Sequence, residues 1–588
     1  MNRSLFNDFT IDTENTKIKE SFHNGTSFVF LISLFIYALI GSLLASLIVI
    51  NTIWAVFIFA NHLKVQERNE FITFKELYTV TSPKELISLI NLPLSTVLTI
   101  TTSILLLTFI LYYISKKISN KFEFKISLKT RLAILLIAFI PLTYIIFIDP
   151  NTYNQAILKF HDEKIHNWNP IKRAQANGFI PSFINTIKPN YMDKPDNYNK
   201  MKMKEIEERY FQVAERINAD RKKSINDSIT IYYLSETLIN PTKVPNLLEN
   251  ETPIPFVQKI MNKHISGSIY SQYIGGGTAN IEWTVLTSFS LEVFNEPKAV
   301  TPYSDFYADS NNHHTVLSFF DKKKVAIHPY TAHLYKRKTV YPKIGFDDFL
   351  YLDNGIQHTE KLGTHIRISD AALHKDVLRV AQSQNIGFIH VVSMQNHSPY
   401  TKEIPDMEYI PKINSELYPE KKQKEMINYL QGLRASDMAI EELISELDKF
   451  DIDVNLLLYG DHFPSLFRGL ENQFTEEQIH HTPWFIYMSN GKSLEGSKYE
   501  NISPIFLTTI LLKEGNYYVS PFQALLDCLL DAGVKRIGKN YIITEEGMIE
   551  DKDIETELFK MITDYRLIMY DALFGSNWLS NDFYMKQK

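Results

Sequence analysis

Residues that can bind a metal ion follow two apolar stretches with the composition of buried strands. The run Ile229–Leu234 is followed by Glu236, and the run Val454–Gly460 is followed by Asp461 and His462. Two carboxylates and an imidazole form a set of ligands suited to Mn²⁺, Zn²⁺ or Mg²⁺. Taken singly, each residue is more simply explained as a cap or a surface side chain. Together they predict a metal site beyond the carboxyl ends of neighbouring strands.

Two further predicted strands end in polar residues. Lys324–Ile327 is followed by His328-Pro329-Tyr330, and Ile386–Met394 is followed by Gln395-Asn396-His397. In open α/β sheets, ligands bind outside the carboxyl ends of the strands. We therefore expect these histidines at the same edge as the acidic residues.

A hydroxyl group follows three consecutive glycines. Gly275-Gly276-Gly277 precede Thr278, and the sequence that follows is typical of a helix start. A helix N-terminus offers free N–H groups and the positive end of the helix dipole, and a nearby metal could lower the pKa of the hydroxyl. The simpler alternative is a flexible turn with Asn280 as the helix N-cap.

Composition excludes several classes of protein. The 588-residue chain contains 45% hydrophobic and 22% charged residues, which is inconsistent with a disordered chain. Its net charge of −6 gives no sign of nucleic-acid binding. The single cysteine, Cys528, excludes an intrachain disulfide and a cysteine-rich zinc site.

The first 150 residues contain long apolar stretches. The uncharged segments Gly25–Leu63 and Leu86–Ser115, and the apolar run Leu132–Ile148, predict three or four membrane-spanning helices, with a turn near Gly41-Ser42 in the first segment. Buried helices of a soluble protein rarely lack charges over such lengths. Met1–Gly25 has no short apolar core, so a cleavable signal peptide is not expected.

The charges between the apolar stretches predict the orientation of the chain in the membrane. The segment Lys116–Arg131 contains six basic residues and one acidic residue, Glu123. By the positive-inside rule this segment is a cytoplasmic loop, so the chain after Asp149 lies outside the cell membrane.

The remaining chain is predicted to be an extracytoplasmic α/β domain with a mainly parallel sheet. We expect a transmembrane region at 1–150, a helical connector at 151–225, the catalytic domain at 226–515 and a C-terminal part packed on it at 516–588. The connector contains Ile206, Tyr210, Val213 and Ile217 at helical spacing. A fifth strand is expected at Trp484–Met488, and helices around Ala371–Ala381 and Lys424–Phe450.

Seven segments of the chain resemble the lipoteichoic acid synthase-like phosphoglycerol transferases of the alkaline phosphatase/sulfatase superfamily. Their order and spacing match those of the family. The segments are SETLINPTKVPN, GGGTANIEWTVLTSFS, VAIHPYTAHLYKRKTVYPKIGFDDF, MQNHSPY, YLQGLRASD, YGDHFPSL and DYRLIMYDALFG.

This resemblance implies a role for each matching residue. Thr278 would be the nucleophile and a ligand of a divalent metal, usually Mn²⁺, together with Glu236, Asp461 and His462. His397 would contact the transferred phosphate, and His328, Tyr335 and Arg337 would hold the glycerol phosphate group. Tyr335 and the pair Pro329-Tyr330 depart from the residues of some synthases, a difference that concerns the acceptor and polymer formation.

The function implied is transfer of glycerol phosphate from phosphatidylglycerol, through a phospho-threonine intermediate, to an envelope glycolipid or glycan. One alternative is a phosphoethanolamine transferase, for which disulfides would be usual. Others are a metal-dependent phosphodiesterase or sulfatase-like hydrolase, although sulfatases need Cys or Ser where this chain has Thr278. A membrane-anchored sensor or binding protein is the non-enzyme alternative.

Overall fold

The computed structural model divides into two compact units, Met1–Tyr191 and Met192–Lys588. It describes residues 26–68, 72–74, 94–122, 127–148, 179–187, 189–295, 297–310, 312–332, 334–404, 407–414, 420–489, 496 and 498–585. Met1–Gly25 and most of the expected connector before residue 179 lie outside the described residues.

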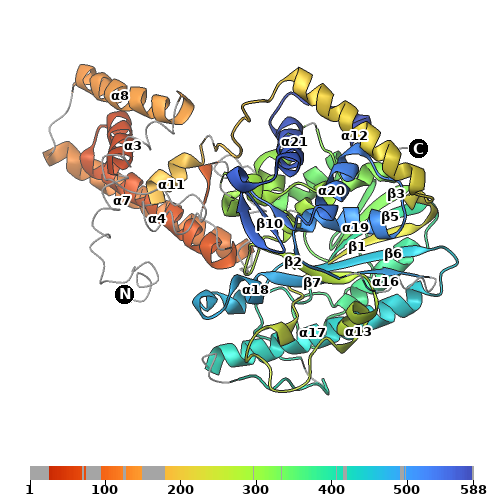
Figure 1. Cartoon of the computed structure of the whole chain (residues 1–588). Helices are drawn as coiled ribbons and strands as arrows, with labels where there is room; N and C mark the ends of the chain where they lie inside the picture. Colours follow the sequence, from red (N-terminus) through yellow and green to blue (C-terminus); the bar gives the residue numbers. More distant parts are fainter. Residues whose placement is uncertain are drawn as a thin grey trace. The chain divides into compact units, whose positions relative to one another are not determined.

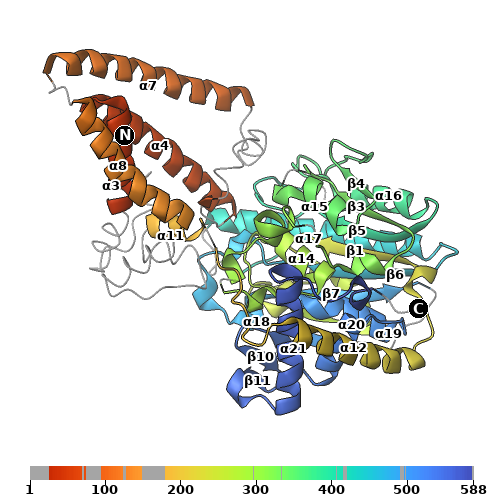
Figure 2. The same cartoon turned by 90° about the horizontal axis from the view of Figure 1, so that it is seen from above.

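The first unit consists of apolar helices, labelled in Figure 2: α3 (Thr26–Ile40), α4 (Leu43–Arg68), α7 (Leu94–Phe122), α8 (Leu128–Thr143, continued by a π-helical turn at Tyr144–Ile148) and the short α11 (Phe179–Asn185). Helix α8 packs on α3, where the rings of Phe35 and Phe139 stack with centroids 6.3 Å apart. The helical structure is interrupted between α3 and α4 at Gly41-Ser42, where the turn was expected.

Two helical segments in this unit are long and apolar enough to cross a membrane: Leu43–Asn61 and Leu128–Phe147. Ser27–Ile40 and Thr102–Ser115 are shorter apolar helices. Many large apolar side chains of these helices are exposed, including Leu107, Phe109 and Ile137 at 58–65%. The number of spans therefore remains a prediction.

The prediction of a loop at Lys116–Arg131 is partly wrong. Helix α7 continues through Lys116, Lys117 and Lys121 to Phe122, and α8 already begins at Leu128. The basic side chains thus belong largely to helix ends. Arg131 donates from Nε to the carbonyl oxygen of Ala38 (2.9 Å), which satisfies an acceptor at the C-terminal end of α3.

The second unit is built on an eight-stranded sheet in the order β4-β3-β5-β1-β6-β7-β2-β8. The strands are β1 (Ile229–Ser235), β2 (Ser266–Tyr270), β3 (Lys323–His328), β4 (Asp348–Tyr351), β5 (Ile386–Val392), β6 (Val454–Gly460), β7 (His481–Met488) and β8 (Lys498–Ile502). Only β7 runs against its neighbours β6 and β2, so the sheet is mainly parallel, as predicted. All five expected strands are present.

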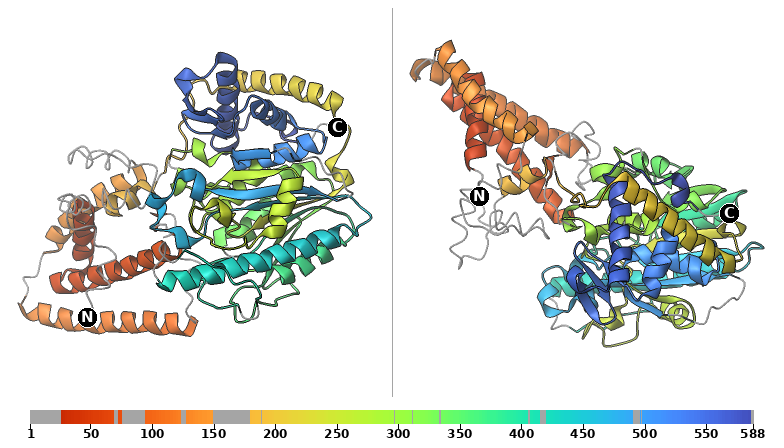
Figure 3. Two further views of the ribbon diagram at one scale, coloured as in Figure 1. Left: turned by 60° about the horizontal axis from the view of Figure 1, so that its bottom comes forward. Right: turned by 45° about the horizontal axis from the view of Figure 1, so that its top comes forward.

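Helices cover both faces of this sheet (Figure 1). On one face lie α13 (Pro255–Lys263), α16 (Asp370–Ala381) and α17 (Glu420–Leu447). On the other lie α12 (Lys200–Asp220), α19 (Leu507–Glu514), α20 (Pro521–Asp531) and α21 (Thr556–Leu573). Helix α14 (Thr278–Thr287) packs against α19 on the same face. In Figure 3 (left) the sheet lies between the teal α17 and the yellow and blue helices.

Alternation along β1 explains why both faces are covered. All seven of its residues are buried. The hydroxyl of Tyr233 contacts Nε2 of His374 on α16 (3.0 Å), whereas the hydroxyl of the adjacent Tyr232 contacts Thr508 on α19 (3.0 Å). Because successive side chains point to opposite faces, a strand with no polar face must be central.

Smaller elements complete the second unit. Short helical segments connect the main elements: α15 (Arg337–Ile344), α18 (Glu476–Ile479) and several 3₁₀ or π turns. A separate antiparallel sheet contains β9 (Arg536–Ile537), β10 (Tyr541–Thr544) and β11 (Gly547–Glu550). Helix α12, expected as part of a connector, belongs to this unit and buries Met203, Ile206, Tyr210 and Ala214.

The end of β6 leaves no room for a side chain at Gly460. A Cβ atom there would lie 2.1 Å from the carbonyl oxygen of Leu238 and 3.0 Å from Cβ of Thr482. We expect Gly460→Ala to destabilise the second unit by about 2–3 kcal/mol, because the backbones must separate. Denaturant unfolding followed by tryptophan fluorescence measures this. The control, Gly533→Ala, has φ +78° and no atom within 4 Å, so we expect it to cost only about 1 kcal/mol. Equal costs for the two variants would contradict this account of the strand ends.

Candidate active site

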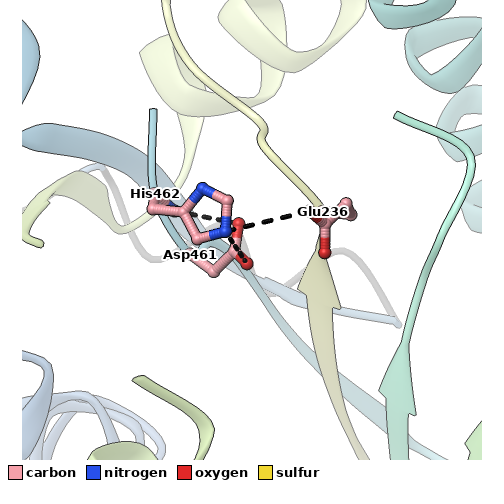
Figure 4. Close-up of side chains that lie close together, drawn as sticks. All are labelled: Glu236, Asp461 and His462. Carbon is pink, nitrogen blue, oxygen red and sulfur yellow. Dashed lines mark hydrogen bonds and ion pairs between the residues drawn. The ribbon is translucent and has the colours of Figure 1, made fainter. Parts of the chain in front are cut away.

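The register of β1 and β6 brings the predicted metal ligands together. The two strands are parallel neighbours, and Ser235 pairs with Gly460 as the last residues of each. Glu236 and Asp461 therefore leave adjacent strands at the same level. Their oxygens and a nitrogen of His462 all lie within 4.8 Å of one another (Figure 4).

The cluster is buried and contains unsatisfied oxygen atoms. Glu236, Asp461 and His462 are each at most 2% exposed. Asp461 accepts hydrogen bonds at Oδ1 from the backbone N–H groups of Thr237 and His462, both at 2.8 Å. In contrast, Oε1 of Glu236 and Oδ2 of Asp461 have no hydrogen-bond partner. Burial, with the nearby Asp461 carboxylate, raises the pKa of Glu236 well above its usual value.

The contacts of His462 indicate which ring nitrogen faces the carboxylates. Its Nδ1 lies 2.9 Å from the carbonyl oxygen of Phe463, so it carries the proton and donates. Nε2 is then an acceptor. It receives the N–H of Gly276 (3.0 Å) and lies 3.2 Å from Oδ2 of Asp461. A metal ion could bind this single lone pair in place of the Gly276 N–H, so His462 is a suitable metal ligand.

These observations fit a divalent cation. Two buried carboxylate oxygens without partners are costly unless a positive charge or a donor faces them. A cation held by Glu236, Asp461 and His462 would supply that charge. Among the described residues, this is the group of acidic and histidine side chains with the geometry of a metal site.

Thr278 lies beside this cluster. Its Oγ1 is 3.4 Å from Oε2 of Glu236 and 3.4 Å from Nε2 of His462. Thr278 is the first residue of α14, and the N-cap is Gly277 rather than Asn280, so the alternative based on an Asn280 cap is wrong. The N–H of Asn280 instead bonds the carbonyl of Gly277 within the first helical turn (2.9 Å).

The glycines before Thr278 are required by the backbone. Gly275, Gly276 and Gly277 have φ values of 69°, 100° and 90°. Such values strain residues that have a Cβ atom. At Gly277 a Cβ would in addition lie 2.5 Å from the ring of Tyr273. The turn thereby aims the N-terminus of α14, with Thr278, at the ends of β1 and β6.

The structure also brings His328, Tyr335 and Arg337 together. His328 at the end of β3 bonds the carbonyl of Val392 through Nδ1 (2.9 Å), and its Nε2 lies 3.4 Å from Nη1 of Arg337. The Arg337 guanidinium lies over the Tyr335 ring at 5.2 Å. Burial, with the charge of Arg337, lowers the pKa of His328 to about 3, so this imidazole is neutral.

Glu282 holds Arg337 in place, a contact that the sequence analysis missed. Oε2 of Glu282 accepts from Nε (3.1 Å) and Nη2 (2.8 Å) of Arg337. Oε1 accepts from the hydroxyl groups of Tyr303 (3.0 Å) and Tyr341 (2.7 Å). Burial alone would raise the pKa of Glu282, but Arg337 holds it well below its usual value.

Both members of this ion pair are at most 2% exposed. Removing one partner of such a pair commonly costs roughly 3–5 kcal/mol. The sequence did contain a signal. Glu282 is the only acidic residue of α14 and follows Thr278 by four positions, which places both on one side of the helix.

His397 lies in the segment that follows β5. Its Nδ1 is 2.7 Å from the carbonyl oxygen of Ser398. Its charged form is among the groups that lower the pKa of His328, so the two imidazoles are within electrostatic range. This segment is tied to the end of β1, because Thr237 donates to the carbonyl of Asn396 (2.9 Å) and Ser393 accepts from the N–H of Glu236 (3.0 Å).

The fold and the site define a class: an α/β domain in which a threonine hydroxyl adjoins a metal-type cluster at the ends of parallel strands. The comparisons with known proteins concern the fold of this domain. Residues 229–514 match the family model described as Sulfatase, so this part of the chain is a sulfatase-family domain.

A solved relative has the same architecture. The phosphoglycerol transferase GacH of Streptococcus pyogenes, in complex with sn-glycerol-1-phosphate, is 27% identical and aligns with a TM-score of 0.60. The match covers 68% of this chain and 100% of that structure. The sulfatase-family domain of this chain thus has the same fold as this transferase.

Two curated proteins of Rhizobium meliloti (strain 1021) are also similar. One is named for cyclic beta-1,2-glucan modification (26% identity over 373 residues, 60% of this chain). The other is the capsular polysaccharide biosynthesis protein RkpI (28% identity over 225 residues, 36% of this chain). The matches span 56% and 37% of the lengths of these relatives.

Metal binding by the cluster can be measured without any substrate. We expect Mn²⁺ to raise the unfolding temperature of the wild-type protein, because a ligand at a hundredfold excess over its Kd adds about 2.7 kcal/mol of stability. Asp461→Asn should abolish this increase, since it removes one negative ligand. The control is Asp353→Asn, which alters an exposed residue outside the cluster. An undiminished increase in Asp461→Asn would contradict the proposed metal site.

Proposed function

We propose that the protein is a membrane-anchored phosphoglycerol transferase that moves glycerol phosphate from phosphatidylglycerol to an envelope glycolipid or glycan. The observation that carries the proposal is the position of the Thr278 hydroxyl, 3.4 Å from both Glu236 and His462 at the start of a buried helix. The similarity to a transferase solved with sn-glycerol-1-phosphate supports the choice of substrate.

Thr278 is the nucleophile in this proposal. Its Oγ1 forms a bond to phosphorus while the bond from phosphorus to the diacylglycerol oxygen breaks. The proton lost by the Thr278 hydroxyl balances the proton gained by the released diacylglycerol. An acceptor hydroxyl then takes the phosphoglycerol group from Thr278 and loses a proton, which restores the threonine hydroxyl.

Glu236, Asp461, His462 and Thr278 would hold a divalent metal, for which we favour Mn²⁺ over Mg²⁺ and Zn²⁺. Such an ion polarises a phosphoryl oxygen and lowers the pKa of a bound hydroxyl. The role of the protein is to keep these ligands dry and fixed, as the burial of Glu236 and Asp461 indicates.

Arg337 would bind the phosphoryl oxygens. A guanidinium has five N–H donors, of which Glu282 and His328 occupy three, so two remain for the substrate. The clamp by Glu282 orients these donors before substrate arrives, which reduces the entropic cost of binding. We assign His397 to the same phosphate, and His328 and Tyr335 to positioning the glycerol phosphate group.

A membrane anchor suits a substrate that never leaves a bilayer. The two helical segments long enough to cross a membrane, Leu43–Asn61 and Leu128–Phe147, would keep the domain near lipid headgroups. We propose a multi-pass protein of the cell membrane with its catalytic domain outside the cytoplasm.

Thr278→Ala should lower the rate of diacylglycerol release from a fluorescent phosphatidylglycerol analogue by at least about 10³-fold, because the attacking oxygen is absent. Thr278→Ser keeps the hydroxyl and should retain measurable turnover. The assay uses the purified full-length protein with Mn²⁺, and with EDTA as a further control.

The outcomes of this assay separate the alternatives. Equal turnover by wild type and Thr278→Ala would contradict the role of the nucleophile. Turnover of a phosphatidylethanolamine analogue in preference to phosphatidylglycerol would identify a phosphoethanolamine transferase. Release of diacylglycerol that does not depend on an added acceptor would indicate a hydrolase.

The proposed orientation can be tested by cysteine labelling. In a Cys528→Ser background, Lys129→Cys should resist a membrane-impermeant thiol reagent in intact cells, whereas Lys200→Cys should react. Both side chains are exposed, so accessibility within the protein does not limit the reaction. The opposite labelling pattern would overturn the proposed topology.

A further inference from the structure

Arg367 differs from three other buried or half-buried arginines of the second unit. Arg337, Arg221 and Arg536 each form an ion pair, with Glu282, Asp527 and Glu292 respectively. Among the described residues, no carboxylate lies within ion-pair distance of Arg367. Its Nε is buried and has no hydrogen-bond partner.

The contacts of Arg367 place it between two segments of the candidate site. Its guanidinium lies over the ring of Tyr330, 4.6 Å from the centroid, in the segment that follows His328. Its Nη2 donates to the carbonyl of Ser398 (3.4 Å), directly after His397. Arg367 thus joins the ends of β3 and β5, the two segments that contain the proposed substrate-binding histidines.

Two guanidinium groups contact the segments that contain the proposed substrate-binding histidines. Arg337 contacts His328 itself, and Arg367 contacts the residue that follows His397. Arg367 is therefore a second guanidinium beside these two histidines.

A guanidinium with unused donors is suited to a phosphoryl group. Only one of its five N–H groups has a partner, and that bond is long. Leaving a charged donor buried and unpaired is unfavourable, and a planar fork of donors matches phosphate oxygens. Stacking on Tyr330 fixes the plane of the guanidinium without using any donor.

We propose that Arg367 is a substrate-binding residue whose positively charged guanidinium contacts the phosphoryl oxygens of the transferred group. It would act in addition to Arg337. This inference rests on the proposed function, because it assigns the ligand of the same site. It extends that proposal by adding a residue and by requiring an anionic phosphoryl ligand.

The test measures binding rather than turnover. Isothermal titration of the purified, Mn²⁺-loaded full-length protein uses two probes, glycerol phosphate and inorganic phosphate. We expect Arg367→Gln to weaken the binding of both by about 10- to 100-fold, the range for a lost hydrogen bond to a charged group. Arg367→Lys keeps the charge but not the fork, and should weaken binding by a smaller factor.

Arg379→Gln is the matched control. Arg379 lies on α16, is half-buried and pairs with Asp376 at 2.6 Å, away from the proposed ligand. Its replacement should leave both affinities unchanged. A purely structural role of Arg367 would lower the unfolding temperature of the ligand-free protein and leave the affinities of the folded protein as in wild type, which would overturn the inference.

The two probes distinguish this inference from the proposed function. Binding of inorganic phosphate that depends on Arg367, without binding of glycerol phosphate, would support the inference and contradict the proposed substrate. Binding of both probes without dependence on Arg367 would refute the inference and leave the proposed function standing. Binding of neither probe by the metal-loaded wild type would refute both.

Discussion

The second unit is organised around two carboxyl groups buried side by side. Glu236 and Asp461 leave adjacent parallel strands at the same level, and each has a carboxylate oxygen without a partner. Burial and mutual repulsion oppose ionisation of both groups, so the rest of the fold must hold them together. The paired ends of β1 and β6, the absence of a side chain at Gly460 and the hydrogen bonds to Oδ1 of Asp461 all do so. A protein maintains such strain where a cation and a reaction benefit from it.

The buried charge of Arg337, in contrast, is balanced within the protein. Its ion pair with Glu282 is fully compensated, and two tyrosine hydroxyls satisfy the remaining carboxylate oxygen. The site thus combines an incomplete acidic cluster with an arginine that is already fixed. In the proposed function the acidic cluster would hold a cation and the fixed arginine would donate to a negative phosphoryl group.

Sequence reasoning succeeded where the signal was local and repeated. Central strands such as β1 and β6 are apolar on both faces, and the polar residues after them could be assigned to one edge. It missed the strands β2, β4 and β8, which are short or polar. Two of them, β4 and β8, form the edges of the sheet. Edge strands bury less, so they leave no continuous apolar run.

Contacts between distant segments were harder to predict. The pair Glu282–Arg337 joins residues 55 positions apart, and Arg367 meets Tyr330 and Ser398 only because β3 and β5 are neighbours. Propensity and spacing do not encode such approaches. The ends of α7 and α8 were misjudged for another reason: lysines have good helix propensity, so a basic segment between apolar stretches can continue a helix.

Helix α14 carries both Thr278, beside the acidic cluster, and Glu282, which binds Arg337. Thr278 and Glu282 are one turn apart, a spacing of about 6 Å along the axis that no loop can alter. The separation between the hydroxyl and the arginine held by Glu282 is thereby set by helical geometry. In the proposed reaction, one turn of helix would therefore fix the distance from the attacking oxygen to the guanidinium that binds the phosphoryl group, whatever the conformation of the surrounding loops.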